Sequence, residues 1–283
     1  MTMTRETIFY EDSAIAGARV VLSLMLIATA CLIADAVVGL RGIDVGTDTH
    51  AYAGVFLAMR DGFIATRFEP GFVLLTRLCS ATGMSVQAYQ AVLFGLSLAA
   101  AMLASRRYFD YLGGTRDYLT FLIAGLMFLF LSPMFVNGSI NAVRQGMASF
   151  LVFAALLSFQ QRQWWRFFLY GALASSLHYS SLLYLAFAPV LLLNLRLQRI
   201  IAVVAFVAYG SGLSMILVRA FVPALYGAVM SYSPGATYRA GVRLDFAVFA
   251  MFWYFLPEGA SRLVRSPFSE LIRQGMTVYL VML

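Results

Sequence analysis

A polar stretch between residues 137 and 146 interrupts an otherwise apolar sequence and contains residues that could bind a phosphate. Arg144 and Gln145 stand where the next apolar segment begins, and Asn141 comes shortly before them. A guanidinium can bind phosphate through two parallel hydrogen bonds, and the free N–H groups at a helix start add further donors. The alternative is that Arg144 only extends its charged end to the membrane surface. The pattern therefore indicates a candidate phosphate site.

His178 lies within an apolar run and is flanked by serines and Tyr179. Ionisable groups inside a membrane segment are costly, so they are functional candidates by default. A neutral imidazole can act as a general base and accept the proton of a sugar hydroxyl. The alternative is a structural histidine that hydrogen-bonds to a neighbouring helix.

Two carboxylates, Asp48 and Glu69, lie between the first and second long apolar segments. Asp48 could be a base, could accept a hydrogen bond from a sugar hydroxyl, or could cap a short helix that follows it. Glu69 directly precedes an apolar segment, which could draw its carboxylate partly into the membrane. The alternative for Glu69 is a salt bridge to Arg67 or Arg77.

Arg243 and Asp245 stand together just before a later apolar run and mark the outer end of that expected span. Their charges could contribute to an outward-facing site. The alternative is that the two form an ion pair at the membrane surface.

The composition predicts an integral membrane protein. Of 283 residues, 61% are hydrophobic and 12% are charged, whereas a soluble domain is about half apolar and about a quarter charged. The net charge of +7 comes from arginine alone, as expected when basic loops face the cytoplasm. Motifs of soluble nucleotide-binding and metal-dependent enzymes are missing, and with 2 histidines we expect neither a metal nor a cofactor.

The apolar periodicity predicts an all-α polytopic membrane protein with a single transmembrane domain, residues 1–283, and about seven to nine transmembrane or re-entrant helices. A short helix over 71–82 would be re-entrant or interfacial, and 167–193 would be one span or two half-helices meeting near His178 at mid-membrane. Basic loops on both sides favour the second reading, a hairpin. We expect external loops at about 41–70, 136–144 and 219–243. The expected spans are 14–40, 86–104, 118–135, 145–159, 200–217 and 244–256.

The order of five short motifs resembles the EpsG-type branch of Wzy-like bacterial polysaccharide polymerases. These motifs are Gly46-Thr47-Asp48 with Tyr52, Phe68-Glu69-Pro70-Gly71-Phe72, the run from Ile140 to Ala148, the run from Leu177 to Leu183, and Arg243-Leu244-Asp245-Phe246. Members of that family usually run longer, so the resemblance implies a short form or a fragment.

The resemblance implies a metal-independent glycosyltransferase of the bacterial inner (cytoplasmic) membrane. It would polymerise undecaprenyl-pyrophosphate-linked oligosaccharide repeat units into exopolysaccharide, capsule or O-antigen at the periplasmic face. Its partners would be the lipid-linked oligosaccharide, membrane lipid, a chain-length regulator and other polysaccharide-assembly proteins, with no nucleic acid and no cofactor. The implied catalytic candidates are His178, Asp48 and Glu69, and the implied substrate-binding residues are Arg144, Gln145, Asn141, Tyr52, Arg243 and Asp245.

Two other classes of function remain open at this stage. A flippase or other transporter of lipid-linked glycans would show matched halves with broken helices, and the sequence shows only one candidate re-entrant pair. A structural membrane subunit of polysaccharide assembly would be indifferent to substitution of Arg144.

Overall fold

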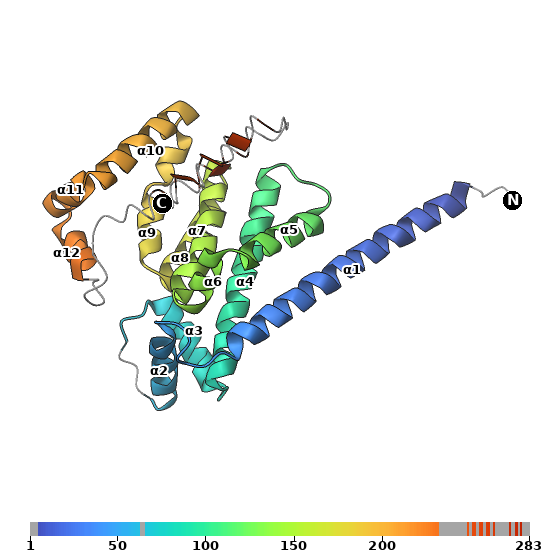
Figure 1. The fold of residues 1–283 in the computed structure, drawn as a ribbon, viewed down its shortest axis with the longest axis horizontal. Helices are drawn as coiled ribbons and strands as arrows, with labels where there is room; N and C mark the ends of the chain where they lie inside the picture. The colour runs from blue at the N-terminus through green and yellow to red at the C-terminus, as the bar shows by residue number, and fades with distance from the viewer. Residues whose placement is uncertain are drawn as a thin grey trace. The chain divides into compact units, whose positions relative to one another are not determined.

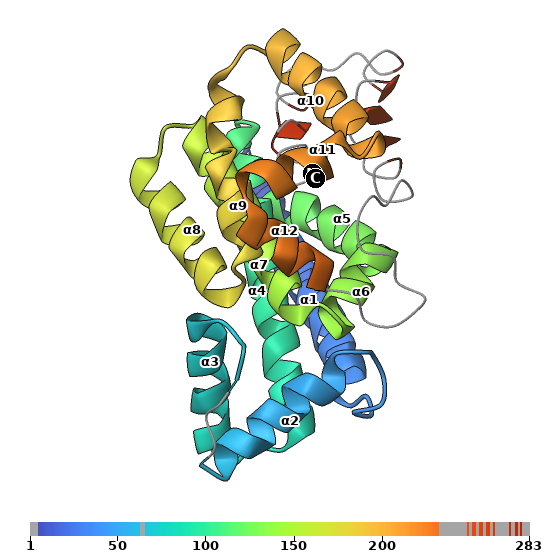
Figure 2. The same cartoon turned by 90° about the vertical axis from the view of Figure 1, so that its left-hand side faces the viewer.

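The computed structural model describes residues 5–62 and 66–231 and, beyond them, isolated residues between 248 and 278. Within these residues all of the regular secondary structure is helical, which confirms the all-α prediction (Figures 1 and 2). The α-helices are α1 (Arg5–Gly39), α2 (Thr49–Arg60), α3 (Pro70–Ala81), α4 (Val86–Tyr111), α5 (Tyr118–Phe130), α6 (Pro133–Ile140), α7 (Val143–Gln160), α8 (Trp164–Leu177), α9 (Ser180–Ala186), α10 (Leu195–Gly210), α11 (Leu213–Phe221) and α12 (Pro223–Ser231), with a 3₁₀ helix at Ala188–Leu192.

The contacts divide the chain into two compact units, residues 1–185 and residues 186–283. The first unit contains α1 to α8 and nearly all of α9, and it holds most of the candidate residues. The second unit contains α10, α11 and α12 among its described residues.

Three described helices are long and apolar enough to cross a membrane: α4, α7 and residues 15–39 of α1. Two bent helix pairs, α5 with α6 and α10 with α11, raise the number to five if each pair forms one span. The chain is therefore a polytopic helical membrane protein. The larger number expected from sequence also included short and re-entrant segments and the run 244–256, most of which lies outside the described residues.

Helices α4, α7 and α8 form the core of the first unit (Figure 1). Small side chains make their close packing possible, since Ala101 and Ala104 of α4 and Ala154 and Ala155 of α7 are all buried. In α7, 61% of the spanning window is buried within the protein, whereas in α1 only 6% is. Helix α7 is thus a central element, and α1 is a peripheral helix suited to lipid contact.

The α5–α6 pair bends by 75° at a break that Pro133 and Ser132 define. Pro133 takes the first turn of α6, where a proline fits without losing a hydrogen bond, and the Ser132 hydroxyl accepts a hydrogen bond from the Phe135 N–H. The segment 136–144, expected as a loop, is helical as far as Ile140. Only the short break between Ile140 and Val143 separates α6 from α7.

The predicted division near His178 is present. Helix α8 ends at Leu177, His178 adopts an extended conformation (φ −158°, ψ 120°), and α9 begins at Ser180. A Cβ added to Gly171 of α8 would lie 3.1 Å from the Leu185 side chain of α9, so α9 folds back along α8. The two helices form the expected hairpin with His178 at its tip.

Other boundaries differ modestly from expectation. Helix α4 begins at Val86 as predicted but continues to Tyr111, past the arginine pair that was expected to end the span. The expected span 200–217 is broken instead, with a bend of 89° at Gly212, whose φ of +77° suits glycine. The first part of the expected loop 219–243 is helical in α11 and α12.

Candidate functional site

The carboxylate of Glu69 is the centre of the candidate site, where it joins three parts of the first unit. One oxygen, Oε2, pairs with Nη1 of Arg144 at the start of α7. The other oxygen, Oε1, lies 2.8 Å from Nδ1 of His178 and accepts a hydrogen bond of 3.2 Å from the Tyr179 N–H. Glu69 is only 4% exposed, so these contacts form inside the protein. Three sequence-distant candidates, Glu69, Arg144 and His178, therefore meet at one point.

The residues around Glu69 leave its carboxylate free to bind partners outside its own helix. Glu69 is the N-cap of α3, in an extended conformation (φ −68°, ψ 150°), and Pro70 takes the first helical position. Its side chain makes no capping hydrogen bond, which leaves both carboxylate oxygens for other partners. The expected alternatives, salt bridges to Arg67 or Arg77, are replaced by the pair with Arg144.

Gly71 allows the start of α3 to lie against the end of α8 (Figure 2). A Cβ at Gly71 would lie 2.3 Å from Oγ of Ser176 and 2.8 Å from its backbone oxygen. Backbone atoms cannot move aside as a flexible side chain can, so only glycine fits this approach. The close contact brings Glu69 within reach of His178.

Three aromatic rings surround the guanidinium of Arg144. Its Cζ lies 4.4 Å from the ring centre of Phe68 and 5.9 Å from the centres of both Tyr52 and Phe72. Such contacts stabilise a cation that has been withdrawn from water. The Nε of Arg144 is buried and has no hydrogen-bond partner among the described residues. Arg144 is thus held in place by Glu69 and the rings, and it does not simply extend to a membrane surface.

His178 lies beside the end of α7 that carries Arg144. Helix α7 leads away from Arg144 and α8 returns alongside it, which brings the tip of the α8–α9 hairpin back to the first turn of α7. The sequence predicted His178 at mid-membrane, deeper than Arg144. Because the carboxylate of Glu69 contacts both side chains, the two residues belong to one site, and the depth of that site in the membrane stays a prediction.

Asn141 organises the segment in front of this site. Its Oδ1 accepts a hydrogen bond of 2.7 Å from the Thr47 N–H, and its Nδ2 donates to Oδ1 of Asn137 at 2.6 Å. Its backbone oxygen accepts a hydrogen bond of 3.3 Å from the Tyr52 hydroxyl. The Asn141 side chain therefore positions the segment at Thr47, and its contact with substrate stays a prediction.

The contact between the Thr47 segment and Asn141 requires a glycine at position 46. Its φ is +101°, a region that favours glycine, and an added Cβ would lie 2.6 Å from Oδ1 of Asn141. The Gly46-Thr47-Asp48 motif thus turns the chain tightly against the break between α6 and α7.

Tyr52 contacts a residue of the site, Arg144, whereas among the residues that the structure describes Asp48 contacts neither Glu69 nor His178. Burial raises the pKa of the Tyr52 phenol above its ordinary value, although the Arg144 charge beside it acts in the opposite direction. Tyr52 therefore stays neutral and can donate its hydroxyl proton. Asp48 occupies the N-cap position of α2, as one alternative expected, but its side chain makes no capping hydrogen bond and no contact with Glu69 or His178 within the described residues.

Glu69 is ionised at neutral pH. Burial works against the charge, but backbone hydrogen bonds and the guanidinium of Arg144 outweigh it, and the pKa of the Glu69 carboxyl lies below its ordinary value. A negative carboxylate beside Nδ1 of His178 favours the tautomer with hydrogen on Nδ1, which makes Nε2 the acceptor.

The remaining candidates are less informative. Gln145 is exposed, and its backbone oxygen accepts a bond of 2.7 Å from the Ser149 hydroxyl. Arg243 and Asp245 lie outside the described residues. Sequence reasoning did not assign a role to Phe68 and Phe72, although their place on either side of Glu69 in one motif could have identified them. Among the described residues, no group of three or more histidine, cysteine or acidic side chains could hold a metal.

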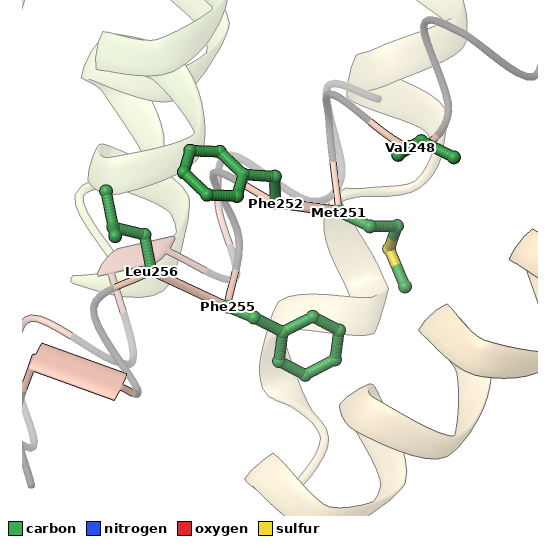
Figure 3. Close-up of a pocket in the computed structure, with 5 residues that line it drawn as sticks. All are labelled: Val248, Met251, Phe252, Phe255 and Leu256. Carbon is green, nitrogen blue, oxygen red and sulfur yellow. The ribbon is translucent and has the colours of Figure 1, made fainter.

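A pocket of about 400 Å³ lies in the second unit, and the side chains that line it are all apolar (Figure 3). It is lined by Val248, Met251, Phe252, Phe255 and Leu256. None of these side chains can transfer a proton or bind a phosphate, so this pocket does not supply the polar chemistry that the sequence predicts.

Comparison with known proteins agrees with the motif order. A model of the EpsG family matches residues 24–283, which is nearly the whole chain. Searches for similar curated proteins and for similar solved structures returned no match. The match extends from within α1 to the C-terminal residue and includes every residue of the Glu69 site. This chain, a multi-pass helical membrane protein, belongs to the EpsG family, whose members are associated with polysaccharide assembly.

Proposed function

We propose that this protein is a metal-independent glycosyltransferase that polymerises lipid-pyrophosphate-linked oligosaccharide repeat units. In this proposal the donor and acceptor are both carried on undecaprenyl pyrophosphate, and the product is an exopolysaccharide, capsule or O-antigen chain. The reaction takes place at the periplasmic face of the bacterial inner membrane. The observation that supports it most directly is the shared carboxylate of Glu69, which holds a phosphate-binding type of residue, Arg144, beside a base, His178.

The proposed reaction joins two lipid-linked glycans. The acceptor hydroxyl oxygen attacks the anomeric carbon of the donor glycan and forms the new glycosidic bond. The bond between that carbon and the pyrophosphate oxygen breaks, and undecaprenyl pyrophosphate leaves with both bonding electrons. Nε2 of His178 accepts the hydroxyl proton, while Glu69 orients the imidazole through Nδ1 and stabilises the positive charge that forms on it.

Arg144 supports the departure of the pyrophosphate. Negative charge develops on the leaving oxygen, and a guanidinium placed in advance can stabilise it without a metal ion. Nη1 of Arg144 is engaged by Glu69 and Nε is buried, so in the proposal Nη2 faces the phosphates. Arg243 would add a second positive charge.

The proposal assigns different roles to the three catalytic candidates. His178 is the base and Glu69 is a positioning residue for it, because both oxygens of Glu69 already have partners. Asp48, with no contact to either, is left as a contact for a sugar hydroxyl. Chain-length regulators and other polysaccharide-assembly proteins would be its partners.

The experiment is complementation of a deletion strain of the host bacterium, with the glycan analysed by length. Wild-type protein should restore long polymer, whereas Arg144→Ala and His178→Ala proteins should leave single-repeat chains. Arg60→Ala, which alters an exposed arginine at the end of α2, should behave as wild type. Full-length polymer from both site variants, at normal protein levels, would disprove the proposal. If deletion instead stops lipid-linked repeats from reaching the periplasm, the protein is a flippase.

A further inference from the structure

A second polar cluster lies at the other ends of α4 and α7. Its members are Arg107 of α4, Gln161 and Gln163 of the α7–α8 connection, and Arg166 in the first turn of α8; we call it the arginine–glutamine cluster. Nη2 of Arg107 donates to Oε1 of Gln163 and, at 3.4 Å, to Oε1 of Gln161. Nη1 of Arg166 donates to the same Gln163 oxygen at 2.7 Å. Two guanidiniums thus converge on a single neutral acceptor.

Positive charge in this cluster exceeds the negative charge near it. Among the described residues, the carboxylate that pairs with this cluster is that of Asp110, which lies 3.6 Å from Nη1 of Arg107 and is shared with Nε of Arg106 at 3.0 Å. The Arg107 side chain is only 8% exposed, and its Nε is buried without a partner among the described residues. A buried cation without full compensation is costly, so the arrangement favours a further anion.

The start of α8 adds donors and aromatic side chains to the same place. Gln163 is the N-cap of α8 but makes no side-chain capping bond, and the Arg166 N–H donates to the Gln163 backbone oxygen at 3.0 Å. The N–H groups of Trp164 and Trp165 have no partner among the described residues, so they are the donors that this helix start can offer to a ligand. Trp164 and Trp165 follow and are 47% and 64% exposed, and the guanidinium of Arg166 lies 5.1 Å from the ring centre of Trp165. Exposed tryptophans beside arginines are typical of the level of lipid headgroups.

The arginine–glutamine cluster and the Glu69 site lie at opposite ends of α7, a helix that is long and apolar enough to cross a membrane. Helix α7 has 18 residues from Val143 to Gln160, which corresponds to about 27 Å. Arg144 stands in its first turn, and Gln161 directly follows its last. This separation is close to the hydrocarbon thickness of a bilayer, about 30 Å.

We propose that the arginine–glutamine cluster binds the phosphate of an anionic membrane lipid. The two guanidiniums and the N-terminus of α8 bind the phosphodiester, while the acyl chains lie against the exposed apolar side of α8, where Phe168 and Leu169 are 67% and 45% exposed. A lipid is favoured over a soluble anion because this apolar surface continues directly from the cluster. The inference does not depend on the proposed polymerase activity, since the cluster lies at the other end of α7 from the Glu69 site.

Lipid binding to the purified full chain tests this inference. Native mass spectrometry in detergent would compare phosphatidylglycerol with phosphatidylcholine, and both with inorganic phosphate and glycerol phosphate. We expect phosphatidylglycerol to bind in preference, with one tightly held lipid. Arg166→Gln and Arg107→Gln should each weaken that binding roughly five- to tenfold. Arg116→Gln, which alters an exposed arginine outside the cluster, should change it less than twofold.

Several outcomes would overturn the inference. Equal binding of the anionic and zwitterionic lipids would show that the phosphate charge is not recognised. An equal loss with Arg116→Gln would show general attraction to positive charge and no built site. Binding of inorganic phosphate or glycerol phosphate as tightly as the lipid would identify a soluble ligand. Because Arg107 is buried and its variant could fail to fold, Arg166→Gln and Arg166→Lys decide the matter, and unchanged binding in both refutes it.

Discussion

Replacement of Glu69 by glutamine tests the central contact of this protein. The change keeps the size of the side chain and one acceptor oxygen but removes the negative charge. Arg144 then loses its counter-ion, and His178 loses the carboxylate that favours hydrogen on Nδ1. Both the stability of the fold and the proposed reaction should suffer, for separate reasons.

The size of the stability loss follows from the burial of the pair. Removing one partner of a buried ion pair costs about 3–5 kcal/mol. The Arg144 side chain is 18% exposed and keeps its aromatic neighbours, and glutamine keeps an acceptor, so we expect a smaller loss of about 2 kcal/mol. For a unit of this size that is a fall in Tm of about 4–8 °C.

The effect on polymerisation should be larger than the effect on stability. General-base catalysis contributes about 100-fold or more to rates, and a neutral partner stabilises the charged imidazole poorly. We therefore expect Glu69→Gln to lower the polymerisation rate by roughly 100-fold. The rate would be measured in proteoliposomes with lipid-linked repeats, and Tm in detergent. Asp61→Asn, which neutralises an exposed carboxylate at the end of α2, is the matched control.

A double-mutant cycle decides whether Glu69 and Arg144 act as a pair. Glu69→Gln and Arg144→Gln, alone and combined, should show a coupling energy of about 1–3 kcal/mol in the free energy of unfolding. A coupling below about 0.5 kcal/mol would refute the ion pair as a stabilising contact. Near wild-type polymerisation by Glu69→Gln would refute its proposed role with His178.

Three further predictions concern the same region. Gly71→Ala should lower both stability and polymerisation, because the added Cβ would lie 2.3 Å from Oγ of Ser176. The control Gly54→Ala, whose Cβ would have nothing within 4 Å, should be neutral. Equal effects of the two substitutions in thermal unfolding would contradict this prediction. Since the pKa of Glu69 is lowered, its ionised form stabilises the fold above the ordinary value of about 4.3 and stops doing so as pH falls through the lowered value. Tm should therefore be level above about pH 5 and fall below about pH 4, with a shallower fall in Glu69→Gln. Asn141→Ala removes the acceptor for the Thr47 N–H and should cost about 1–2 kcal/mol of unfolding free energy, while an unchanged Tm would show that this contact is dispensable.

Much of the fold could be predicted because the length of each apolar segment can be read directly from the sequence. The starts of α2, α3 and α4 follow from Thr49 after Asp48, from Pro70, and from Ser85, whose hydroxyl accepts a bond of 3.1 Å from the Ala88 N–H. Helix ends were less predictable. The sequence reading ended α4 at its arginine pair, but Arg107 is bound by glutamines of the α7–α8 connection, so the helix continues through it. A local rule cannot include a partner more than fifty residues away.

The identities of the site residues were also largely predictable, but their relations were not. Arg144, His178 and Glu69 were each unusual for a membrane chain, and that alone made them candidates. Whether they share one site depends on how far α8 returns along α7, and on Gly71 admitting Ser176 at close range. Neither the position of α8 along α7 nor the approach of Gly71 to Ser176 can be predicted from residue type or spacing.

Composition and motif order by themselves determined that this is a helical membrane protein of the EpsG family, because hydrophobic length and residue type are properties of short segments. Only the tertiary structure decided that Glu69 pairs with Arg144 and not with its neighbours Arg67 or Arg77. It also decided that His178 reaches the same carboxylate. These two contacts of Glu69 depend on packing between helices that are far apart in the chain. Small residues set how closely those helices approach, and a buried charge is stable only when it is paired.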